Sequence, residues 1–384
     1  MPVAPRRVAM TFAATIALFL GACGSNNAAE STGEAAGATS AEATEALETA
    51  YTGVTGSPPT TSTKAKDGVS LWVVSCGEQV PSCSTPVAGV QEAAKLIGWD
   101  VKVCDGQLNP NGWGTCIRQA ASGGADVVIP VGIDCAAVQA PLQEAKAAGV
   151  KLVGGGGSDC DATGGEKLLD SERLQLENTS IKDYWKLNGK LQADWIIGKT
   201  DGKAKVVLLN FTDPVWGPWI TEGFKEELAT CTGCEIVQTL DIANADTTNN
   251  TAATKFSTAL LQAPTANAVS IPIGGWMSLG LSQAIVSSGR SAQLNVVTGF
   301  GNEVNMDLIR DDKGQDAVLG YATEWGSYGS VDTAIRVVNG EQPLVQGDGF
   351  QIVDADHNLP ATAGEDYAGS VDYKTVYKKA WGVS

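Results

Sequence analysis

Short apolar runs alternate with amphipathic stretches along the chain from residue 69 onward. The run at 69–75, VSLWVVS, is almost continuously apolar, as in a strand buried on both faces. In the stretch at 86–98, apolar residues recur every three or four positions, as on one face of a helix. The two patterns then repeat through 99–104, 114–124, 125–131, 135–149 and 150–154. Strict alternation predicts βαβ units, which build a parallel sheet with right-handed crossovers.

A second series of alternating elements begins near residue 181. Its predicted helices are 181–198, 217–230, 250–262 and 276–289, and its predicted strands are 204–210, 235–241, 267–273 and 294–300. Two successive series predict an α/β protein with two doubly wound parallel-sheet lobes. Because ligands of open parallel sheets bind beyond the carboxyl ends of the strands, we expect a binding cleft between the lobes.

The N-terminus carries an export signal. Arg6 and Arg7 precede an apolar run at 8–22, which is too short for a membrane span of about 20 residues but suits a secretory signal. The run ends in LGAC at 20–23, which resembles the lipobox of bacterial lipoproteins. That resemblance implies that residues 1–22 are removed and that Cys23 carries the lipid. Residues 23–66 are rich in Ala, Glu, Thr, Ser and Gly without apolar periodicity, so they are predicted to form a disordered tether.

Cysteine usage agrees with export. The chain has nine cysteines, and the eight that follow Cys23 predict disulfides in an oxidising compartment. Pairing of neighbours is expected, because each pair closes a short loop beside a predicted strand end. The expected pairs are Cys76–Cys83, Cys104–Cys116, Cys135–Cys160 and Cys231–Cys234. The last pair, CTGC, follows a helix instead of opening one, which favours a structural disulfide over a redox or zinc site.

Length and charge narrow the function classes. At 384 residues and 43% hydrophobic, the chain can bury a large core and exceeds one ordinary domain. Its 26 basic and 43 acidic residues give a net charge of −17, which excludes nucleic acid as a partner. The arginines lie in the signal, helices or linkers, so an anionic ligand is disfavoured.

Five motifs occur in a fixed order between about Val69 and Gly340. They are DGQLNP at 105–110, the segment 122–153, ITEGFKEEL at 220–228, MSLGLSQAIVSSGR at 277–290 and VVTGFGNE at 296–303. Together they resemble type I periplasmic binding proteins, and most closely the ribose-type, carbohydrate-binding branch. Repressors that share this fold core have a helix-turn-helix in front, where this chain has the lipoprotein signal.

The resemblance implies a three-strand hinge, crossed near Asn178, Glu324 and Gly347. The lobes are then 69–178 plus 325–346, and 179–324 plus 347–384. It also implies a monomeric solute-binding protein, anchored by lipid outside the cell membrane, that serves an ABC permease and its ATPase. No cofactor, metal or catalytic residue is expected. His357 is the only histidine and has no Ser or Cys nearby in a recognisable nucleophile motif, so an exported enzyme has little support.

Three positions depart from the sugar-binding pattern of this family. Gly301 replaces the usual Asp after Gly-Phe, Gly274–Gly275 replaces Asn-Asp, and GGGGSD at 154–159 replaces Asp-Arg. In place of these anchors, tryptophans stand at ligand-facing positions, including both indoles of DPVWGPW at 213–219. The expected ligand-binding residues are Glu78, Gln79, Asp134, Asp159, Asp213, Trp216, Trp219, Trp276, Asn302, Glu324 and Trp325.

Two ligand types fit these residues. An indole face stacks on a sugar ring or an aromatic ring and also attracts a cation, while the acids accept sugar hydroxyls or balance a cation. A neutral carbohydrate or polyol is the leading ligand, and a small cationic or aromatic compound is the alternative. Asp134 has a competing role as helix N-cap, which we favour slightly. A receptor that serves a sensor kinase is an alternative to the importer function.

Overall fold

The computed structural model describes residues 36–384, with side chains from residue 41 onward. The predicted signal peptide 1–22 and the lipid-bearing Cys23 lie outside the described residues. Within the described part of the chain, no helix has both the length and the apolar character needed to cross a membrane.

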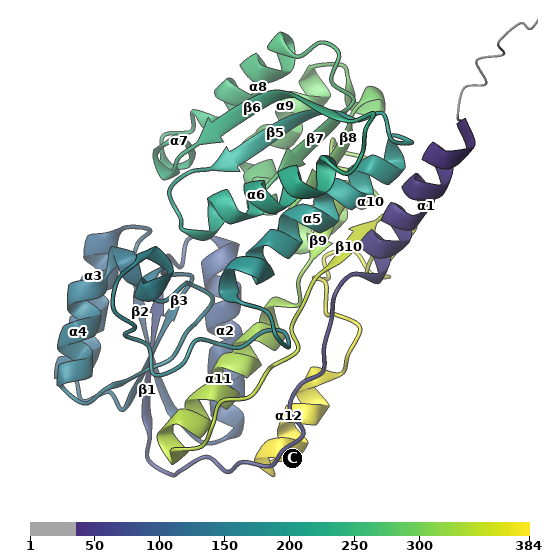
Figure 1. Ribbon diagram of the computed structural model, residues 1–384. Helices are drawn as coiled ribbons and strands as arrows, with labels where there is room; N and C mark the ends of the chain where they lie inside the picture. The colour runs from purple at the N-terminus through teal and green to yellow at the C-terminus, as the bar shows by residue number, and fades with distance from the viewer. Residues whose placement is uncertain (1–35) are drawn as a thin grey trace, which may run out of the picture. The chain divides into compact units, whose positions relative to one another are not determined.

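The first lobe is built on a parallel four-stranded sheet in the order β2-β1-β3-β4 (Figure 1). Its strands are β1 (Ser70–Ser75), β2 (Asp100–Asp105), β3 (Val127–Val131) and β4 (Lys151–Leu152), and its helices are α2 (Pro81–Leu96), α3 (Pro110–Ser122) and α4 (Gln139–Ala147). Leu71 and Val73 enter a core with α2, while Val74 enters a second core with α3 and α4. Both faces of β1 are therefore buried, which explains its continuous apolar run.

The second lobe is built on a six-stranded sheet in the order β10-β9-β8-β7-β5-β6. The strands are β5 (Lys205–Phe211), β6 (Glu235–Ile242), β7 (Ala268–Ile271), β8 (Asn295–Thr298), β9 (Ala317–Gly320) and β10 (Gln351–Asp354). The helices are α5 (Ile181–Lys199), α6 (Trp216–Leu228), α7 (Asn244–Thr248), α8 (Ala252–Gln262), α9 (Leu281–Ser287) and α10 (Glu303–Arg310). Helices α5 and α6 cover one face, and α8 and α9 cover the other. The predicted two-lobed α/β fold is confirmed, although β10 runs antiparallel to β9.

Three chain segments connect the two sheets. The first connects β4 to α5, the second leads from β9 into α11 (Thr323–Asn339), and the third returns from α11 to β10. Helix α11 belongs to the first lobe, because its Ser327 and Tyr328 donate hydrogen bonds to Pro86 and Glu92 of α2. Helix α12 (Tyr373–Trp381) also packs against α11, so the C-terminus returns to the first lobe and not to the second as expected.

The segment 36–66 differs from the predicted disordered tether. Residues Ala36–Thr52 form helix α1, and Ala43 and Ala50 of this helix are buried. The chain then continues as an extended segment in which Pro58 and Pro59 are buried. Alanine side chains contribute little to an apolar pattern, yet they let a helix lie close to its neighbour. The tether prediction is therefore corrected from residue 36 onward.

Four disulfides join the expected neighbours: Cys76–Cys83, Cys104–Cys116, Cys135–Cys160 and Cys231–Cys234. The first three lie in the first lobe, and each fastens a segment at the carboxyl end of a strand. Their Cα–Cα distances of 4.9–5.6 Å lie within the normal range for disulfides. Because these three disulfides are formed in the folded state, the loops that they link have little freedom to rearrange.

A buried acid lies between α1 and the second lobe. Asp194 of α5 is 7% exposed and lines a cavity of about 450 Å³, together with Glu42 and Glu45 of α1, Lys190 of α5 and Glu227 of α6. Burial, followed by the negative charge of Glu227, raises the pKa of Asp194 from 3.8 to about 7. The folded protein therefore holds this proton more tightly than the unfolded chain does.

Stability should consequently fall as the pH rises through about 7, since the proton bound in the folded state is lost there. Between pH 5 and pH 8 this loss is on the order of 3 kcal/mol, so we expect a lower melting temperature at pH 8 than at pH 5. Asp194→Asn should remove most of this difference in melting temperature. Thermal unfolding followed by circular dichroism measures both. Asp67→Asn, which changes an exposed acid of the first lobe, is the control, and an equal pH dependence in both variants would contradict the assignment.

Candidate functional site

Aromatic side chains follow the strands of the second sheet at their carboxyl ends. Phe211 ends β5, Trp216 opens α6, Phe300 follows β8 and Tyr321 follows β9. Trp216, Phe300 and Tyr321 are partly exposed, whereas Phe211 is buried. Phe300 meets Trp216 and Tyr321 edge to face, with ring centroids 6.2 and 5.6 Å apart. Such edge contacts fix the rings in place and leave one apolar face at the end of the sheet.

Trp185 of α5 packs against two rings of this aromatic face, Trp216 and Phe300. Its ring stacks on Trp216 with centroids 4.9 Å apart and meets Phe300 edge to face at 5.0 Å. The side chain is 8% exposed, and its indole N–H has no hydrogen-bond partner among the described residues. The packing of Trp185 therefore positions Trp216.

The four tryptophans predicted at the cleft have different surroundings. Trp216 and Trp219 are both partly exposed and pack against the core that contains α5. Trp276 is 4% exposed and meets Phe211 edge to face at 5.0 Å, so it belongs to the interior of the second lobe. Trp325 is 2% exposed, stacks on a ring of α12 and donates its indole N–H to the carbonyl of Gln346. The expectation that Trp276 and Trp325 face a ligand is therefore corrected, because both are core residues.

Asp134 makes a direct contact between the lobes. Its Oδ2 accepts a hydrogen bond of 3.1 Å from the backbone N–H of Val215, which precedes α6 in the second lobe. Its Oδ1 accepts from both the backbone N–H and the hydroxyl of Ser158, at 2.9 and 2.8 Å. Asp134 occupies the expected N-cap position of the helical turn that begins at Cys135, but its side chain makes no capping bond there. A carboxylate at a helix N-terminus is instead favourable because of the helix dipole.

The glycine run 154–157 brings Ser158 to this position. A Cβ on Gly155 would lie 2.7 Å from the carbonyl oxygen of Pro130, and a Cβ on Gly157 would overlap that of Ile133. The run therefore packs directly on the backbone at the end of β3, where larger residues have no room. This close approach occurs within the first lobe.

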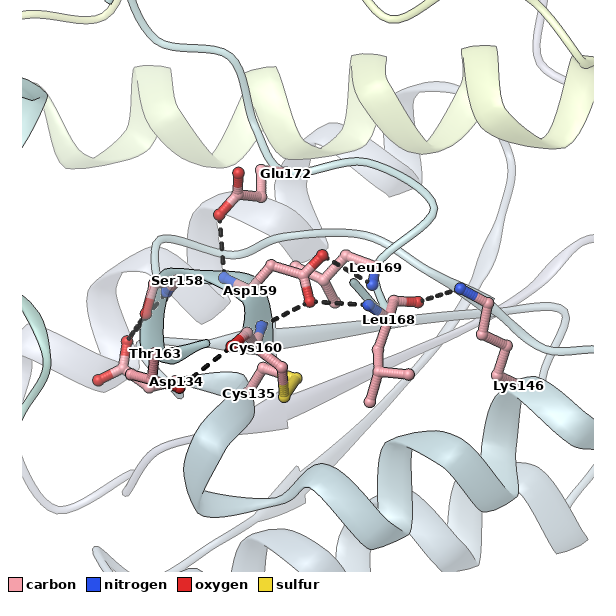
Figure 2. The surroundings of a disulfide bond; sticks show 10 residues. All are labelled: Asp134, Cys135, Lys146, Ser158, Asp159, Cys160, Thr163, Leu168, Leu169 and Glu172. Carbon is pink, nitrogen blue, oxygen red and sulfur yellow. Dashed lines mark hydrogen bonds between the residues drawn. A yellow bond between two sulfur atoms is a disulfide. The ribbon is translucent and has the colours of Figure 1, made fainter. Parts of the chain in front are cut away.

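Asp159 organises the next loop and is fully buried (Figure 2). Its carboxylate accepts backbone N–H groups of Cys160, Leu168 and Leu169 at 2.7–3.1 Å. The prediction that Asp159 binds ligand is corrected, since its oxygens are occupied by the loop. Asp159 and the sulfurs of Cys135 and Cys160 are close enough to suggest a metal site, but both sulfurs belong to a disulfide.

The remaining predicted residues have mixed roles. Glu78 and Gln79 are exposed in the loop after β1, with side chains available to a ligand. Asp213 accepts the backbone N–H of Asn244 at 2.6 Å, within its own lobe. Asn302 accepts the N–H of Val304 and caps α10. Glu324 pairs with Lys374 of α12 at 2.7 Å and accepts the Tyr373 hydroxyl, so it faces α12.

A cavity of about 300 Å³ lies at the first crossing, with walls from both lobes. Its lining includes Asp161 and Glu172 of the first lobe, Thr179 and Ser180 of the second, and Arg173 of the crossing itself. The backbone N–H of Asp159 donates to Glu172, whose pKa is raised chiefly by burial. This volume accommodates a small molecule, and its polar lining offers both donors and acceptors, the latter including two carboxylates.

Arg173 and Tyr321 were missed by the sequence reasoning. The Arg173 guanidinium is buried, pairs with Asp348 at 3.1 Å and donates to the Tyr321 hydroxyl at 2.8 Å. Burial raises the pKa of Tyr321 well above its usual range, so the hydroxyl stays protonated. Tyr321 could have been found, because it directly follows the apolar run AVLG at the end of a strand. Arg173 lies in a polar linker, and no local pattern marks it.

Two doubly wound α/β lobes, joined by crossing segments and facing each other at the carboxyl ends of their strands, define a two-lobed binding protein. Residues 81–342 match the family described as "Periplasmic binding protein domain", and the chain belongs to this family. The predicted resemblance is thereby confirmed. No curated protein is similar enough in sequence to count as a match.

Solved structures share the fold at low sequence identity. An ABC transporter solute-binding protein from Actinobacillus succinogenes with bound D-allose has a TM-score of 0.62 at 16% identity, covering 75% of this chain and 97% of that one. The 5-methylthioribose transporter solute-binding protein from Thermotoga lettingae has 0.64 at 16%, covering 82% and 100%. A solute-binding protein from Mycobacterium smegmatis with bound glycerol has 0.61 at 17%, covering 77% and 98%. At these identities the likeness establishes the type I fold.

The contact of Asp134 with Val215 yields a direct test. Asp134→Ala removes the acceptor at the start of α6, so the Val215 amide should exchange with solvent about tenfold faster or more. Hydrogen exchange read by NMR measures this rate. Asp213→Ala is the matched control, because the Asp213 carboxylate lies in the same loop as Val215 but accepts its hydrogen bond from Asn244 within the second lobe. Equal rates in the two variants would show that the contact does not hold the lobes together.

Proposed function

We propose that the protein is the extracytoplasmic, lipid-anchored solute-binding component of an ABC importer, and that it binds a neutral carbohydrate or polyol between its lobes. The observation that carries the proposal is the partly exposed aromatic face at the strand ends of the second lobe, formed by Trp216, Phe300 and Tyr321. A sugar ring has an apolar C–H face that stacks on such rings and hydroxyls that bond to acceptors.

The acceptors for those hydroxyls come from the first lobe and the crossing. Glu78 and Gln79 are exposed beside the end of β1, and Asp161 and Glu172 line the cavity at the first crossing. The compared proteins support this ligand class, since their structures hold D-allose, 5-methylthioribose or glycerol.

Charge favours a neutral ligand over an anion. The arginine that lines the cavity, Arg173, is already paired with Asp348, while the other charged residues of the lining are acids. An anion would therefore meet repulsion. The same acids and indoles favour the second candidate, a small cationic or aromatic compound. An indole face attracts a cation by about 0.5–2 kcal/mol and also stacks on an aromatic ring. Service to a sensor kinase, in place of a permease and ATPase, is the third candidate.

The mechanism is binding coupled to hinge closure. The crossing segments permit one lobe to rotate against the other, and a ligand that touches both lobes favours the closed form. A shift from 1:99 to 99:1 closed requires about 5.5 kcal/mol of differential affinity. Stacking on the second lobe and hydrogen bonds to the first are both complete only when the cleft is closed, so their sum supplies this difference.

A thermal-shift screen tests the ligand class. The mature chain with Cys23→Ser is heated with neutral sugars and polyols, with small amines and with aromatic compounds. We expect a neutral sugar or polyol to raise the melting temperature, because a ligand at 1,000 times its dissociation constant stabilises by about 4 kcal/mol. A rise with amines alone would favour the second candidate and contradict the first.

Trp216→Ala tests the aromatic face with any compound that scores in the screen. We expect the affinity to fall about tenfold or more, and Trp216→Phe to retain most of it, because a smaller ring still stacks. Isothermal titration calorimetry measures both. Trp72→Ala is the control, because that indole lies on the first sheet next to Lys102. An unchanged affinity in Trp216→Ala would remove this residue from the site.

The lipid anchor is tested separately. In the producing cell, Cys23→Ala should release the protein from the membrane fraction, because no acyl chain can then be attached. Fractionation and incorporation of a labelled fatty acid measure this. A variant that stays membrane-bound and labelled would show that the anchor lies elsewhere.

A further inference from the structure

An extended segment at 53–66, which we term the N-terminal strap, runs from the second lobe to the first. It begins where α1 ends, on the second lobe. There the Tyr51 hydroxyl donates to Asp354 Oδ2 at 2.6 Å, and the Tyr51 ring stacks on His357 with centroids 3.7 Å apart. Asp354 ends β10, so the start of the strap is fastened to the edge strand of the second sheet.

The middle of the strap pairs with the third hinge crossing. Val54 and Phe350 exchange two backbone hydrogen bonds of 2.8 and 2.9 Å, and Gly56 donates its N–H to the carbonyl of Gly347 at 2.9 Å. This short antiparallel ladder lies along the residues that carry the chain from α11 to β10. The strap is therefore a further strand of the hinge itself.

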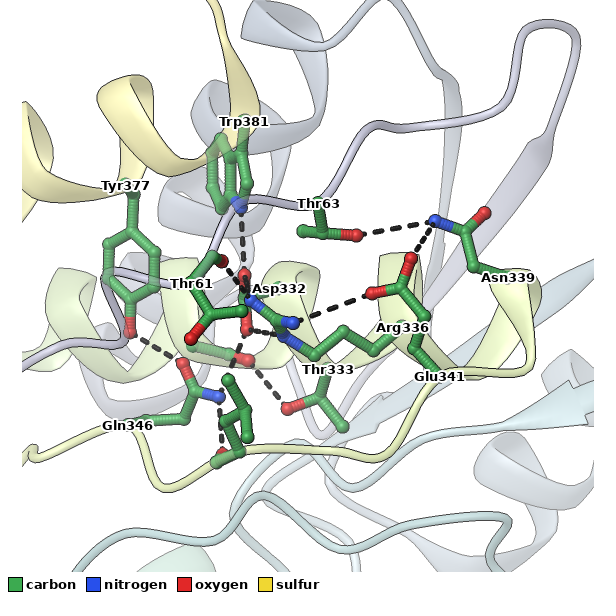
Figure 3. Close-up of polar contacts among 12 residues, drawn as sticks. Thr61, Thr63, Asp332, Thr333, Arg336, Asn339, Glu341, Gln346, Tyr377 and Trp381 are labelled. Atoms are coloured by element: carbon green, nitrogen blue, oxygen red, sulfur yellow. Dashed lines mark hydrogen bonds and ion pairs between the residues drawn. The ribbon is translucent and has the colours of Figure 1, made fainter.

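The far end of the strap is fastened to the first lobe (Figure 3). Arg336 of α11 donates to the carbonyl of Thr61 at 2.8 Å, and Thr63 donates its N–H to the carbonyl of Ala380 in α12 at 3.0 Å. Arg336 is itself buried and paired with Asp332, which also accepts the Trp381 indole N–H at 2.9 Å. The strap is thus attached to the first lobe through a buried network of polar side chains.

We propose that the N-terminal strap restrains the separation of the lobes and sets the open–closed balance of the protein before ligand binds. Any rotation that opens the cleft must stretch the strap between Tyr51 and Thr61, shear its ladder with the third crossing, or detach one end. In the structure the strap makes all of these contacts while Asp134 accepts the hydrogen bond from Val215. The contacts of the strap are therefore compatible with lobes that are in contact with each other. Release of the strap should then increase the open population. This inference rests on the proposed binding function, whose closure it regulates.

Two glycines provide a matched pair of substitutions. Gly53 and Gly68 both have a positive φ, +64° and +74°, so an alanine at either position carries a similar backbone strain. A Cβ on Gly53 would overlap the carbonyl oxygen of Phe350 and lie 2.7 Å from Gln351 Cα, whereas a Cβ on Gly68 would meet nothing within 4 Å. Gly53→Ala therefore pushes the strap off the crossing, and Gly68→Ala does not.

The experiment compares these variants of the mature chain, with Cys23→Ser and without any solute. In Gly53→Ala we expect the amides of Val54 and Phe350 to exchange about tenfold faster or more than in Gly68→Ala, and the Val215 amide to follow them. Small-angle scattering should show a larger radius of gyration for Gly53→Ala. Faster exchange at Val54 with an unchanged radius and unchanged Val215 exchange would overturn the proposal, since the strap would then only cover the hinge.

A second pair of variants keeps the proposal testable if Gly53→Ala does not fold or does not release the strap. Tyr51→Phe keeps the ring on His357 but removes the hydroxyl bond to Asp354, and Tyr328→Phe removes a hydroxyl bond within the first lobe. A larger radius in Tyr51→Phe than in Tyr328→Phe supports the strap, and equal radii together with equal Val215 exchange contradict it. Because no solute is present, a negative ligand screen would count against the proposed function and leave this result unaffected.

Discussion

The buried ion pair between Arg173 and Asp348 joins the first hinge crossing to the third. Its nitrogen and oxygen are 3.1 Å apart, and both side chains are almost fully buried. Burial of one charge without the other would be strongly unfavourable, so the two crossings are held together at this point. Tyr321, at the start of the second crossing, bonds to both partners, at 2.8 Å to Arg173 and 3.3 Å to Asp348. All three crossings therefore meet in one polar cluster, around which the lobes are arranged.

The two lobes contribute different chemistry to the space beyond their strands. The second lobe supplies rings, since Trp216, Phe300 and Tyr321 follow its strands and are fixed by edge contacts. The first lobe supplies carboxylate and amide groups on loops that disulfides hold in place. Asp134 of the first lobe also reaches the start of α6, so contact between the lobes satisfies a helix N-terminus. A solute that stacks on one side and accepts or donates hydrogen bonds on the other matches this division.

The N-terminal strap differs from the free tether that the sequence predicts between the proposed lipid site and the first lobe. A free tether would leave the lobes independent of the membrane attachment. Here the segment that follows the proposed anchor enters through α1 on the second lobe and ends on α11 and α12 of the first. The strap thus begins 30 residues after Cys23, the proposed site of lipid attachment.

The sequence alone determined the two α/β lobes, because buried strands and amphipathic helices leave periodic patterns that survive without any tertiary information. Nearest-neighbour pairing of the cysteines was an expectation that the sequence could not fix, since eight cysteines allow 105 pairings, and the structure shows that pairing. The sequence could not distinguish the partly exposed Trp216 from the buried Trp276 and Trp325, because all three stand near strand ends and burial depends on what packs against them. Nor could it place Arg173 beside Asp348 or seat residues 53–66 on the hinge. Those contacts join segments more than 170 residues apart, and only the folded arrangement of both lobes brings them together.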